Sequence, residues 1–214
     1  MLVLGVARPE HAREVAGLRR ALSRSRHDVE LHLEPPRPGA GKWANLNVLL
    51  AAHPADGFDW LLLVDDDVRL PRGFLDPFLL CAERFGLRLA QPAHAFASHA
   101  AWDVTRRRPG LLARTGRFVE IGPVTALHRD TFGTLLPFPD LRMGWGLDAR
   151  WSAVAAEHGW PIGIVDATPV RHLRPVAGAY PRDEAMAEAE AFLDGRAYVT
   201  RQQAGETIAE HRTL

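Results

Sequence analysis

The sequence predicts an α/β domain in which a mostly parallel, mixed sheet carries helices on both faces. Strand-like and helix-like patterns alternate through the first 85 residues, which is the order that builds such a sheet. Several of the strand-like segments are continuous apolar runs, as expected where both faces of a strand are buried. The chain has 214 residues, 47% of them hydrophobic, so it can bury one sizeable core and one domain is expected.

The predicted elements of the first part follow one another closely. Residues 2–7 form a short apolar run typical of a buried strand, and apolar residues at helical spacing predict a helix over 9–26. An alternating pattern predicts a half-buried strand over 28–33, before the loop PPRPGAG. A helix is predicted over 42–53. The run DWLLLVDDDV at 59–68 then predicts a fully buried strand that ends in three carboxylates.

The second part of the chain has weaker patterns. Strands are predicted at 87–91, 118–121 and 161–165, and a polar stretch with three arginines lies between the first two. Apolar residues on one face predict a helix over 147–158, which ends at Gly159. The last thirty-odd residues contain an Ala- and Glu-rich helix and a weakly patterned tail.

Composition narrows the range of partners and compartments. Twenty-six acidic residues balance twenty-six basic ones, so no overall charge would attract nucleic acid or an anionic membrane. Cys81 is the single cysteine and cannot form an internal disulfide. The opening MLVLGVA is too short to span a bilayer and lacks the features of a secretory signal. We therefore expect a cytoplasmic protein without a transmembrane segment or a nucleic-acid partner, and the oligomeric state stays open.

Three consecutive aspartates form the strongest chemical signal. Side chains alternate along an extended strand, so Asp65 and Asp67 should share one side, about 6 to 7 Å apart, while Asp66 points away. Two carboxylates at that distance repel by about 2 to 3 kcal/mol at an effective dielectric near 20. A divalent cation with oxygen ligands, magnesium or manganese, would offset this repulsion. The alternative is that the aspartates only cap the following turn or are solvated.

The segment VDDDVRLPRGFLDPFL resembles the aspartate motif of GT-A glycosyltransferases, in which an apolar strand runs into Asp-x-Asp and continues through a proline into a helix. GWGLD at 144–148 and VRHLRP at 170–175 follow in the order that this family shows. With QPA at 91–93 and FVEIGPV at 118–124, the combination is similar to uncharacterised GT-A-like domains found widely in plants. The resemblance covers about residues 61–174 and implies a Rossmann-like sheet of the GT-A type.

This resemblance implies a metal site and a donor site. Asp67 would ligate Mn²⁺ or Mg²⁺, Asp65 would contact the ribose or the cation and its water shell, and His172 would complete the metal shell. The base and ribose of the nucleotide would lie near the end of the first predicted strand and on the loop before the aspartate strand. Candidate residues for binding it are Arg8, Lys42, Asn45, Asp65 and Asp66. We expect one domain over 1–214, with a nucleotide-binding half at 1–91, an acceptor-binding and catalytic half at 92–180, and a C-terminal helix and tail at 181–214.

The catalytic base is expected at Asp148. This residue lies in the first turn of a predicted helix, where the helix dipole favours a charged carboxylate, although such acids are often only caps. Inverting galactosyltransferases carry a similar GWG segment whose acid deprotonates the acceptor. They often have a second acid beside it, where this chain has Leu147. Glu120 is therefore the other candidate for the base.

Trp145 has a flat apolar face on which a sugar could lie, or it fills the core; together with Gly146 and Gln91 it is a candidate for substrate binding. The expected function is metal-dependent transfer of a sugar, with inversion, from a uridine diphosphate sugar to a hydroxyl acceptor. One alternative is a non-catalytic module that binds a sugar nucleotide or polysaccharide. The other is a haloacid-dehalogenase-like phosphatase, which places its Asp-x-Asp near the N-terminus and needs a downstream basic residue, whereas Lys42, the single lysine, precedes the motif here.

Overall fold

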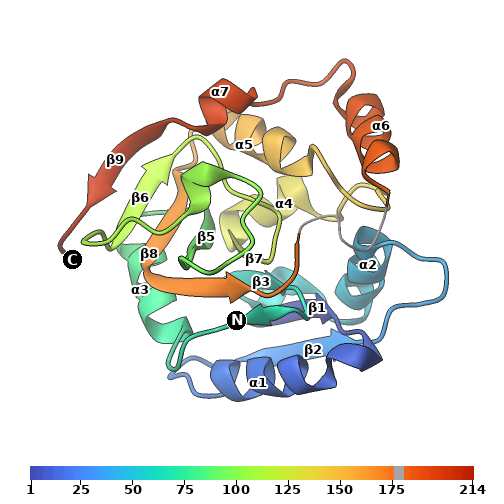
Figure 1. The fold of residues 1–214 in the computed structure, drawn as a ribbon, viewed down its shortest axis with the longest axis horizontal. Helices are drawn as coiled ribbons and strands as arrows, with labels where there is room; N and C mark the ends of the chain where they lie inside the picture. Colours follow the sequence, from blue (N-terminus) through green and yellow to red (C-terminus); the bar gives the residue numbers. More distant parts are fainter. Residues whose placement is uncertain (176–180) are drawn as a thin grey trace.

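A mixed sheet forms the centre of the protein in a computed structural model that describes residues 1–175 and 181–214 (Figure 1). The strands follow the order β2-β1-β3-β7-β5-β8-β6-β9, and β4 pairs with β8 beside this path. Along the path, β6 and β7 run opposite to the other strands, so most strands point in one direction, as the sequence predicts. The strands are β1 (Leu2–Val6), β2 (Glu30–Glu34), β3 (Trp60–Val64), β4 (Val68–Arg69), β5 (Leu89–His94), β6 (Ala113–Gly116), β7 (Val124–His128), β8 (Ile162–His172) and β9 (Thr207–His211).

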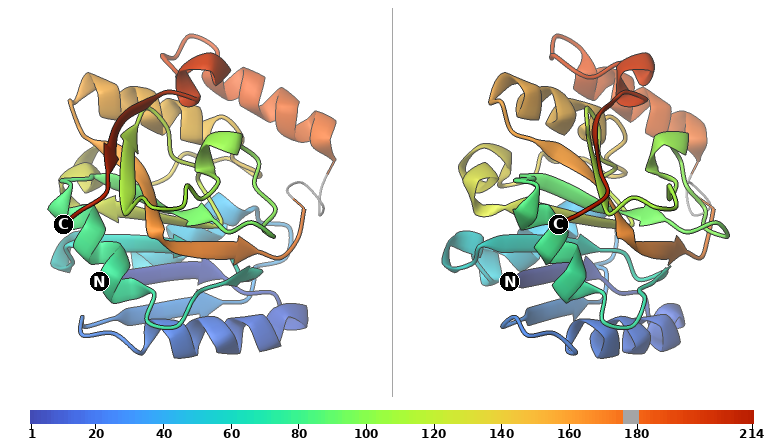
Figure 2. Two further views of the ribbon diagram at one scale, coloured as in Figure 1. Left: turned by 60° about the vertical axis from the view of Figure 1, so that its left-hand side comes forward. Right: turned by 90° about the vertical axis from the view of Figure 1, so that its left-hand side faces the viewer.

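Helices cover both faces of this sheet, and the C-terminal elements α6, α7 and β9 lie at the end of the molecule opposite to α1 and β2 (Figure 2). In that group the chain passes from α6 through α7 into β9, which lies outermost beside β6. The helices are α1 (Ala12–Leu22), α2 (Lys42–Ala52), α3 (Leu75–Arg84), α4 (Phe132–Leu135), α5 (Leu147–Glu157), α6 (Arg182–Leu193) and α7 (Arg201–Ala204). Short 3-10 turns are η1 (Pro9–His11), η2 (Ala55–Gly57), η3 (Asp103–Thr105) and η4 (Arg129–Thr131).

The central strand β3 shows why its sequence is apolar throughout. Side chains alternate across a strand, and β3 supplies Leu62 to one apolar cluster and Leu61 to another. The first cluster contains residues of α1 and α3, and the second contains residues of α2, α4 and α5. Both faces of β3 are therefore buried under helices, and polar residues appear only after the strand ends.

Two predicted elements need correction. Residues 118–121 do not form a strand but belong to the irregular connection between β6 and β7. The backbone of Glu120 forms hydrogen bonds with side chains instead of a neighbouring strand: its N–H donates to the Gln91 side chain, and its carbonyl accepts from the Thr125 hydroxyl. The tail is also more ordered than its pattern predicts, since β9 pairs with β6. Residues 176–180, at the end of the expected catalytic half, lie outside the described residues.

The predicted strand at 161–165 is longer in the structure. β8 extends for 11 residues, because after its pairing with β5 it continues past the sheet and pairs with β4. This extension places His172, the last residue of β8, opposite Val68. The end of β8 and the turn after β3 are thereby held side by side.

Candidate functional site

The three aspartates lie in the turn that follows β3, and the shortest contact of each is with a different residue, although Arg8 lies 3.8 Å from Asp67 Oδ2 as well as beside Asp66. The backbone N–H of Asp65 donates to the Pro123 carbonyl at 2.8 Å, which joins this turn to the segment before β7. β3 is parallel to β1, so the turn lies at the carboxyl ends of both strands. This is the edge at which α/β sheets bind ligands.

Asp65 pairs with Lys42, the first residue of α2. The Lys42 Nζ lies 2.6 Å from Asp65 Oδ1, and 3.4 Å from the carbonyl oxygen of Ile121. A Cβ atom at Gly122 would lie 2.8 Å from Asp65 Oδ2, closer than real Cβ atoms approach other atoms. The glycine thus allows the 121–123 segment to lie directly against the Asp65 carboxylate.

Asp66 is buried and forms an ion pair with Arg8, whose side chain is partly exposed. The Arg8 guanidinium donates to both carboxylate oxygens at 2.6 and 2.9 Å, and the Arg8 backbone N–H donates at 2.7 Å. The His11 Nδ1 lies 3.0 Å from the same carboxylate. Burial by itself raises the pKa of Asp66, but the hydrogen bonds from Arg8 and the nearby His11 ring outweigh it and hold the pKa below its usual value. The hydrogen bonds between Arg8 and Asp66 therefore hold the end of β1 against the turn after β3.

Asp67 faces His172 across the β4–β8 pairing. The His172 Nε2 lies 3.2 Å from Asp67 Oδ1, and the Leu173 N–H donates to the Asp67 carbonyl at 2.9 Å. Burial lowers the pKa of His172, whereas the carboxylate of Asp67 raises it, and the net direction is upward. Burial likewise raises the pKa of Asp67, but the hydrogen bond and the charge of His172 prevail and lower it.

The tautomer of His172 makes this pair a candidate cation site. The His172 Nδ1 lies 3.1 Å from the His99 carbonyl oxygen, which can only accept, so Nδ1 carries a proton. In the neutral ring, the Nε2 lone pair then faces an oxygen of Asp67 at 3.2 Å. Two acceptors at this distance require a positive charge between them, supplied by a proton or by a metal ion. The donor set, imidazole nitrogen plus carboxylate oxygen, therefore fits a divalent cation such as Mn²⁺.

Asp65 does not join this pair as closely as the sequence predicts. No choice of one ligand atom from each of Asp65, Asp67 and His172 brings all three within 4.8 Å of one another. Asp65 is held instead by Lys42. The structure thus brings Asp67 and His172 together and leaves Asp65 beside them.

Asp148 lies in the first turn of α5, which begins after Gly146 with a φ of 86°. The backbone N–H of Ala149 donates to Asp148 Oδ1 at 2.8 Å. Burial, together with the nearby negative charge of Glu120, raises the pKa of Asp148 to about 7. A carboxyl group with such a pKa can accept or release a proton near neutral pH.

Glu120 lies in a buried network of donors. The Trp102 N–H and the Thr105 hydroxyl lie 3.0 and 3.3 Å from Glu120 Oε1, and the His94 Nε2 lies 2.8 Å from Oε2. The His94 Nδ1 lies 2.7 Å from the Ser98 hydroxyl. Ser98 also accepts the backbone N–H of His172 at 2.8 Å. An unbroken chain of hydrogen bonds therefore connects Glu120 to the residue that faces Asp67.

Other sequence candidates have structural partners. The Asn45 side chain bonds the Arg37 N–H and the carbonyls of Ala40 and Gly41, and so holds the loop before α2. Gln91 is only 1% exposed and orients Glu120. The Arg182 guanidinium lies 5.9 Å from the centre of the Trp145 ring. A Cβ at Gly146 would lie 3.1 Å from the Leu193 side chain, so Gly146 lets α6 pack closely.

Sequence reasoning did not identify His11, His94, Ser98 or Trp102 as parts of this region. Each reaches its partner across a long sequence separation or from an irregular loop, so no local spacing marks it. The tripeptide QPA at 91–93 could have pointed to one of them, because it immediately precedes His94 in β5.

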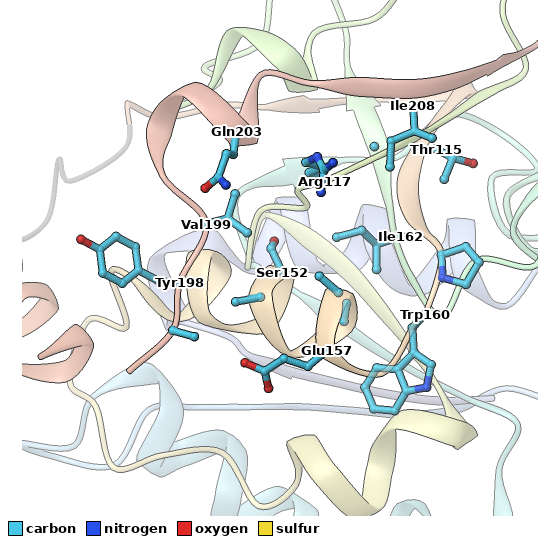
Figure 3. A pocket seen from close by; sticks show the side chains of 16 residues that line it. Thr115, Arg117, Ser152, Glu157, Trp160, Ile162, Tyr198, Val199, Gln203 and Ile208 are labelled. Carbon is cyan, nitrogen blue, oxygen red and sulfur yellow. The ribbon is translucent and has the colours of Figure 1, made fainter. Parts of the chain in front are cut away.

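A cavity of about 420 Å³ lies elsewhere, between β6, α5 and the segment that leads to β9 (Figure 3). Trp160, Tyr198 and Val199 line it, and none of the aspartates after β3 does. The Ser152 hydroxyl, on α5, is buried without a hydrogen-bond partner among the described residues. Asp148 precedes Ser152 by one helical turn but does not line the cavity. The cavity is therefore distinct from the carboxylate cluster.

The fold is of the GT-A type. The structure is similar to "Crystal structure of GalNAc-T7 with UDP, GalNAc and Mn2+", with a TM-score of 0.58 and 12% identity over 90% of this chain and 47% of that one, so the chain spans about half the length of that neighbour. It is also similar to S. aureus TarS 1-349 in complex with UDP-GlcNAc, with a TM-score of 0.58 and 10% identity over 91% of this chain and 67% of that one. A197 from STIV matches with a TM-score of 0.51 and 10% identity, over 81% and 85% of the two chains.

No protein-family model and no curated protein sequence matches the chain. At these levels of identity the similarity demonstrates the fold alone. Among the described residues, no helix has the length and apolar character needed to cross a membrane.

Proposed function

We propose that the chain is a cation-dependent glycosyltransferase that moves a hexose, with inversion, from a uridine diphosphate sugar to a hydroxyl-bearing acceptor. The approach of His172 Nε2 to Asp67 Oδ1 at 3.2 Å, at the ligand-binding edge of the sheet, is the observation that carries the proposal. The solved structures with UDP, GalNAc and Mn²⁺, and with UDP-GlcNAc, support the choice of donor class.

The donor would be held by residues that surround this pair. Asp67 and His172 would bind a Mn²⁺ or Mg²⁺ ion, with Asp65 beside them and Lys42 adding a positive charge at 2.6 Å from Asp65. When bound, such an ion supplies positive charge that offsets the charge developing on the leaving diphosphate. Arg8 acts through Asp66, because their ion pair keeps the aspartate turn in place.

Asp148 would be the base of the transfer. The acceptor oxygen forms a bond to the anomeric carbon of the sugar, the bond from that carbon to the diphosphate breaks, and the acceptor proton passes to Asp148. A base with a pKa of about 7 is close to the optimum for this task at neutral pH. Inverting enzymes often have a second acidic residue directly before the base, where this chain has Leu147. Glu120 would take the part of that second acid, and its negative charge contributes to the raised pKa of Asp148.

A non-catalytic module that binds a sugar nucleotide is the second candidate, because Leu147 departs from the pattern of the inverting enzymes. A GT-A-type fold with its Asp-x-Asp after the third strand does not favour a haloacid-dehalogenase-like phosphatase.

A panel of uridine diphosphate hexoses, tested with Mn²⁺, with Mg²⁺ and with chelator, separates these possibilities. A donor at 100 times its dissociation constant should add about 2.7 kcal/mol to the free energy of unfolding, seen as a higher melting temperature with the cation. His172→Ala should weaken this effect, whereas the control His27→Ala, at an exposed position, should preserve it. Release of uridine diphosphate supports the enzyme, binding without release supports the module, and no binding by any member contradicts both.

A further inference from the structure

A second group of potential metal ligands lies at the opposite end of the sheet from the aspartate turn. Among the described residues, Glu30, His32 and His53 form a group in which one ligand atom from each lies within 4.8 Å of the others. Glu30 and His32 belong to the edge strand β2 and, two positions apart, point to the same side. His53 directly follows the last residue of α2.

The position of this group separates it from the proposed donor site. Glu30 pairs with Leu2 at the start of β1, whereas the aspartates follow the end of β3, which is parallel to β1. α2 begins at Lys42 beside Asp65 and ends at Ala52 next to His53, and its 11 residues extend about 16 Å along the helix axis. A cation bound here could not contact a diphosphate at the aspartate turn.

Contacts within the group converge on one carboxylate. The His32 Nε2 lies 2.8 Å from Glu30 Oε1, and the His53 Nδ1 lies 3.6 Å from the same oxygen. The two imidazole rings are stacked, with centroids 3.3 Å apart and planes inclined by 15°.

This donor set is suited to zinc. Two imidazole nitrogens and one carboxylate oxygen, with the fourth position open to water, form a set found in zinc sites, where ligand distances of about 2.0 to 2.2 Å place neighbouring ligand atoms about 3.3 to 3.5 Å apart. Because the two rings are stacked and nearly parallel, they must rotate out of the stack before both lone pairs can point at one ion. The exposed fractions of the three side chains, 48%, 21% and 31%, leave room for such movement.

We propose that Glu30, His32 and His53 bind a zinc ion and join the edge strand β2 to the end of α2. Two imidazole ligands favour zinc, whereas the proposed donor site has one imidazole beside carboxylate and phosphate oxygens, which magnesium and manganese prefer, so the two sites should differ in metal preference. The inference does not depend on glycosyl transfer.

Calorimetric titration of the chelator-treated protein with Zn²⁺ at pH 7.5 tests the proposal. The parent protein should bind zinc at this site, and His32→Ala, His53→Ala and Glu30→Gln should each weaken that binding at least about tenfold, since loss even of a residue that only supports a metal ligand costs that much. The exposed residue His27 offers a matched control, and His27→Ala should bind zinc as the parent does. His172→Ala should also retain this binding event.

Two further measurements keep the result interpretable. Each variant is melted in chelator, and a melting temperature equal to that of the parent shows that it folds. The visible spectrum of the parent with Co²⁺ should show tetrahedral absorption that is lost in His32→Ala. Zinc affinity that is unchanged in all three variants, or lost only in His172→Ala, would overturn the assignment.

Discussion

The Nε2 atom of His94 lies 2.8 Å from a carboxylate oxygen of Glu120, and both side chains are almost completely buried. Glu120 accepts further bonds from the Trp102 N–H and the Thr105 hydroxyl. His94 also contacts Ser98, and Ser98 accepts a hydrogen bond from the backbone N–H of His172. The His94–Glu120 pair therefore helps to hold His172 in position in the candidate cation site. We therefore interpret Glu120 as a positioning residue and Asp148 as the base.

Glu120→Gln should lower the stability of the protein. The amide has one acceptor oxygen and places its NH₂ group against a donor, so at least one buried bond to a charged group is lost, at a cost of about 1.5 to 3 kcal/mol. For a chain of this length the melting temperature should fall by about 3 to 12 °C. Glu10→Gln, at an exposed position, is the control and should melt like the parent. Equal melting temperatures for Glu120→Gln and the parent would argue against the network.

Asp148→Asn should retain donor binding and lose transfer. The amide keeps the shape of the side chain but cannot take the acceptor proton, so the transfer rate should fall at least about 100-fold. Single-turnover rates, measured after donor affinity has been matched, test this directly. The exposed Asp183→Asn should transfer at the parent rate. A near-normal rate in Asp148→Asn would move the base to another residue.

The rate of transfer should depend on pH through Asp148. Its pKa of about 7 means that the ionised, proton-accepting form declines below neutrality. The logarithm of kcat/KM should therefore fall with a slope of about one per pH unit below pH 7 and level off above it. A profile that is flat between pH 5.5 and pH 7 would be inconsistent with Asp148 as the base.

Stability should also depend on pH through the same carboxyl group. The folded-state pKa of about 7 exceeds the ordinary value of 3.8, so ionisation favours the unfolded chain as the pH rises from about 4 to 7, and the penalty stays constant above that range. Three pKa units correspond to about 4 kcal/mol as an upper bound. Asp148→Asn removes the penalty, so it should melt above the parent at pH 8 and equal to it at pH 4. A variant that melts below the parent at pH 8 would refute this.

Asp67→Ala and Asp66→Ala should differ in kind, although the residues are adjacent. Asp67→Ala should lose Mn²⁺-dependent binding of uridine diphosphate, because it removes a ligand of the proposed cation. Its melting temperature in chelator should fall less than that of Asp66→Ala, since it removes one contact with His172 rather than three hydrogen bonds from Arg8. Asp66→Ala should lower the melting temperature in chelator, since it removes the carboxylate that accepts three hydrogen bonds from Arg8. Calorimetry and thermal melting measure the two effects. Unchanged nucleotide affinity in Asp67→Ala would reject the metal assignment.

Local sequence patterns were sufficient for the fold class. A strand buried on both faces must be apolar at every position, and a helix covering a sheet must repeat its apolar residues at helical spacing, so β1, β3 and α2 are visible in the sequence. The strand predicted at 118–121 was wrong because a short apolar run does not show whether its backbone bonds to a neighbouring strand or to side chains such as Gln91 and Thr125. Strand β9 was not predicted for a related reason, since its pairing with β6 joins residues that are 91 to 98 positions apart in the sequence.

The sequence by itself determined that three carboxylates follow a buried strand, because that statement needs only neighbouring residues. Tertiary structure alone decided their separate roles: Asp65 pairs with Lys42, Asp66 with Arg8, and Asp67 with His172. The pKa of Asp148 is likewise a tertiary property, since it depends on the burial of its carboxyl group and on the charge of Glu120. Charges and hydrogen bonds act through distances in space, and sequence spacing determines such distances only within one helix or strand.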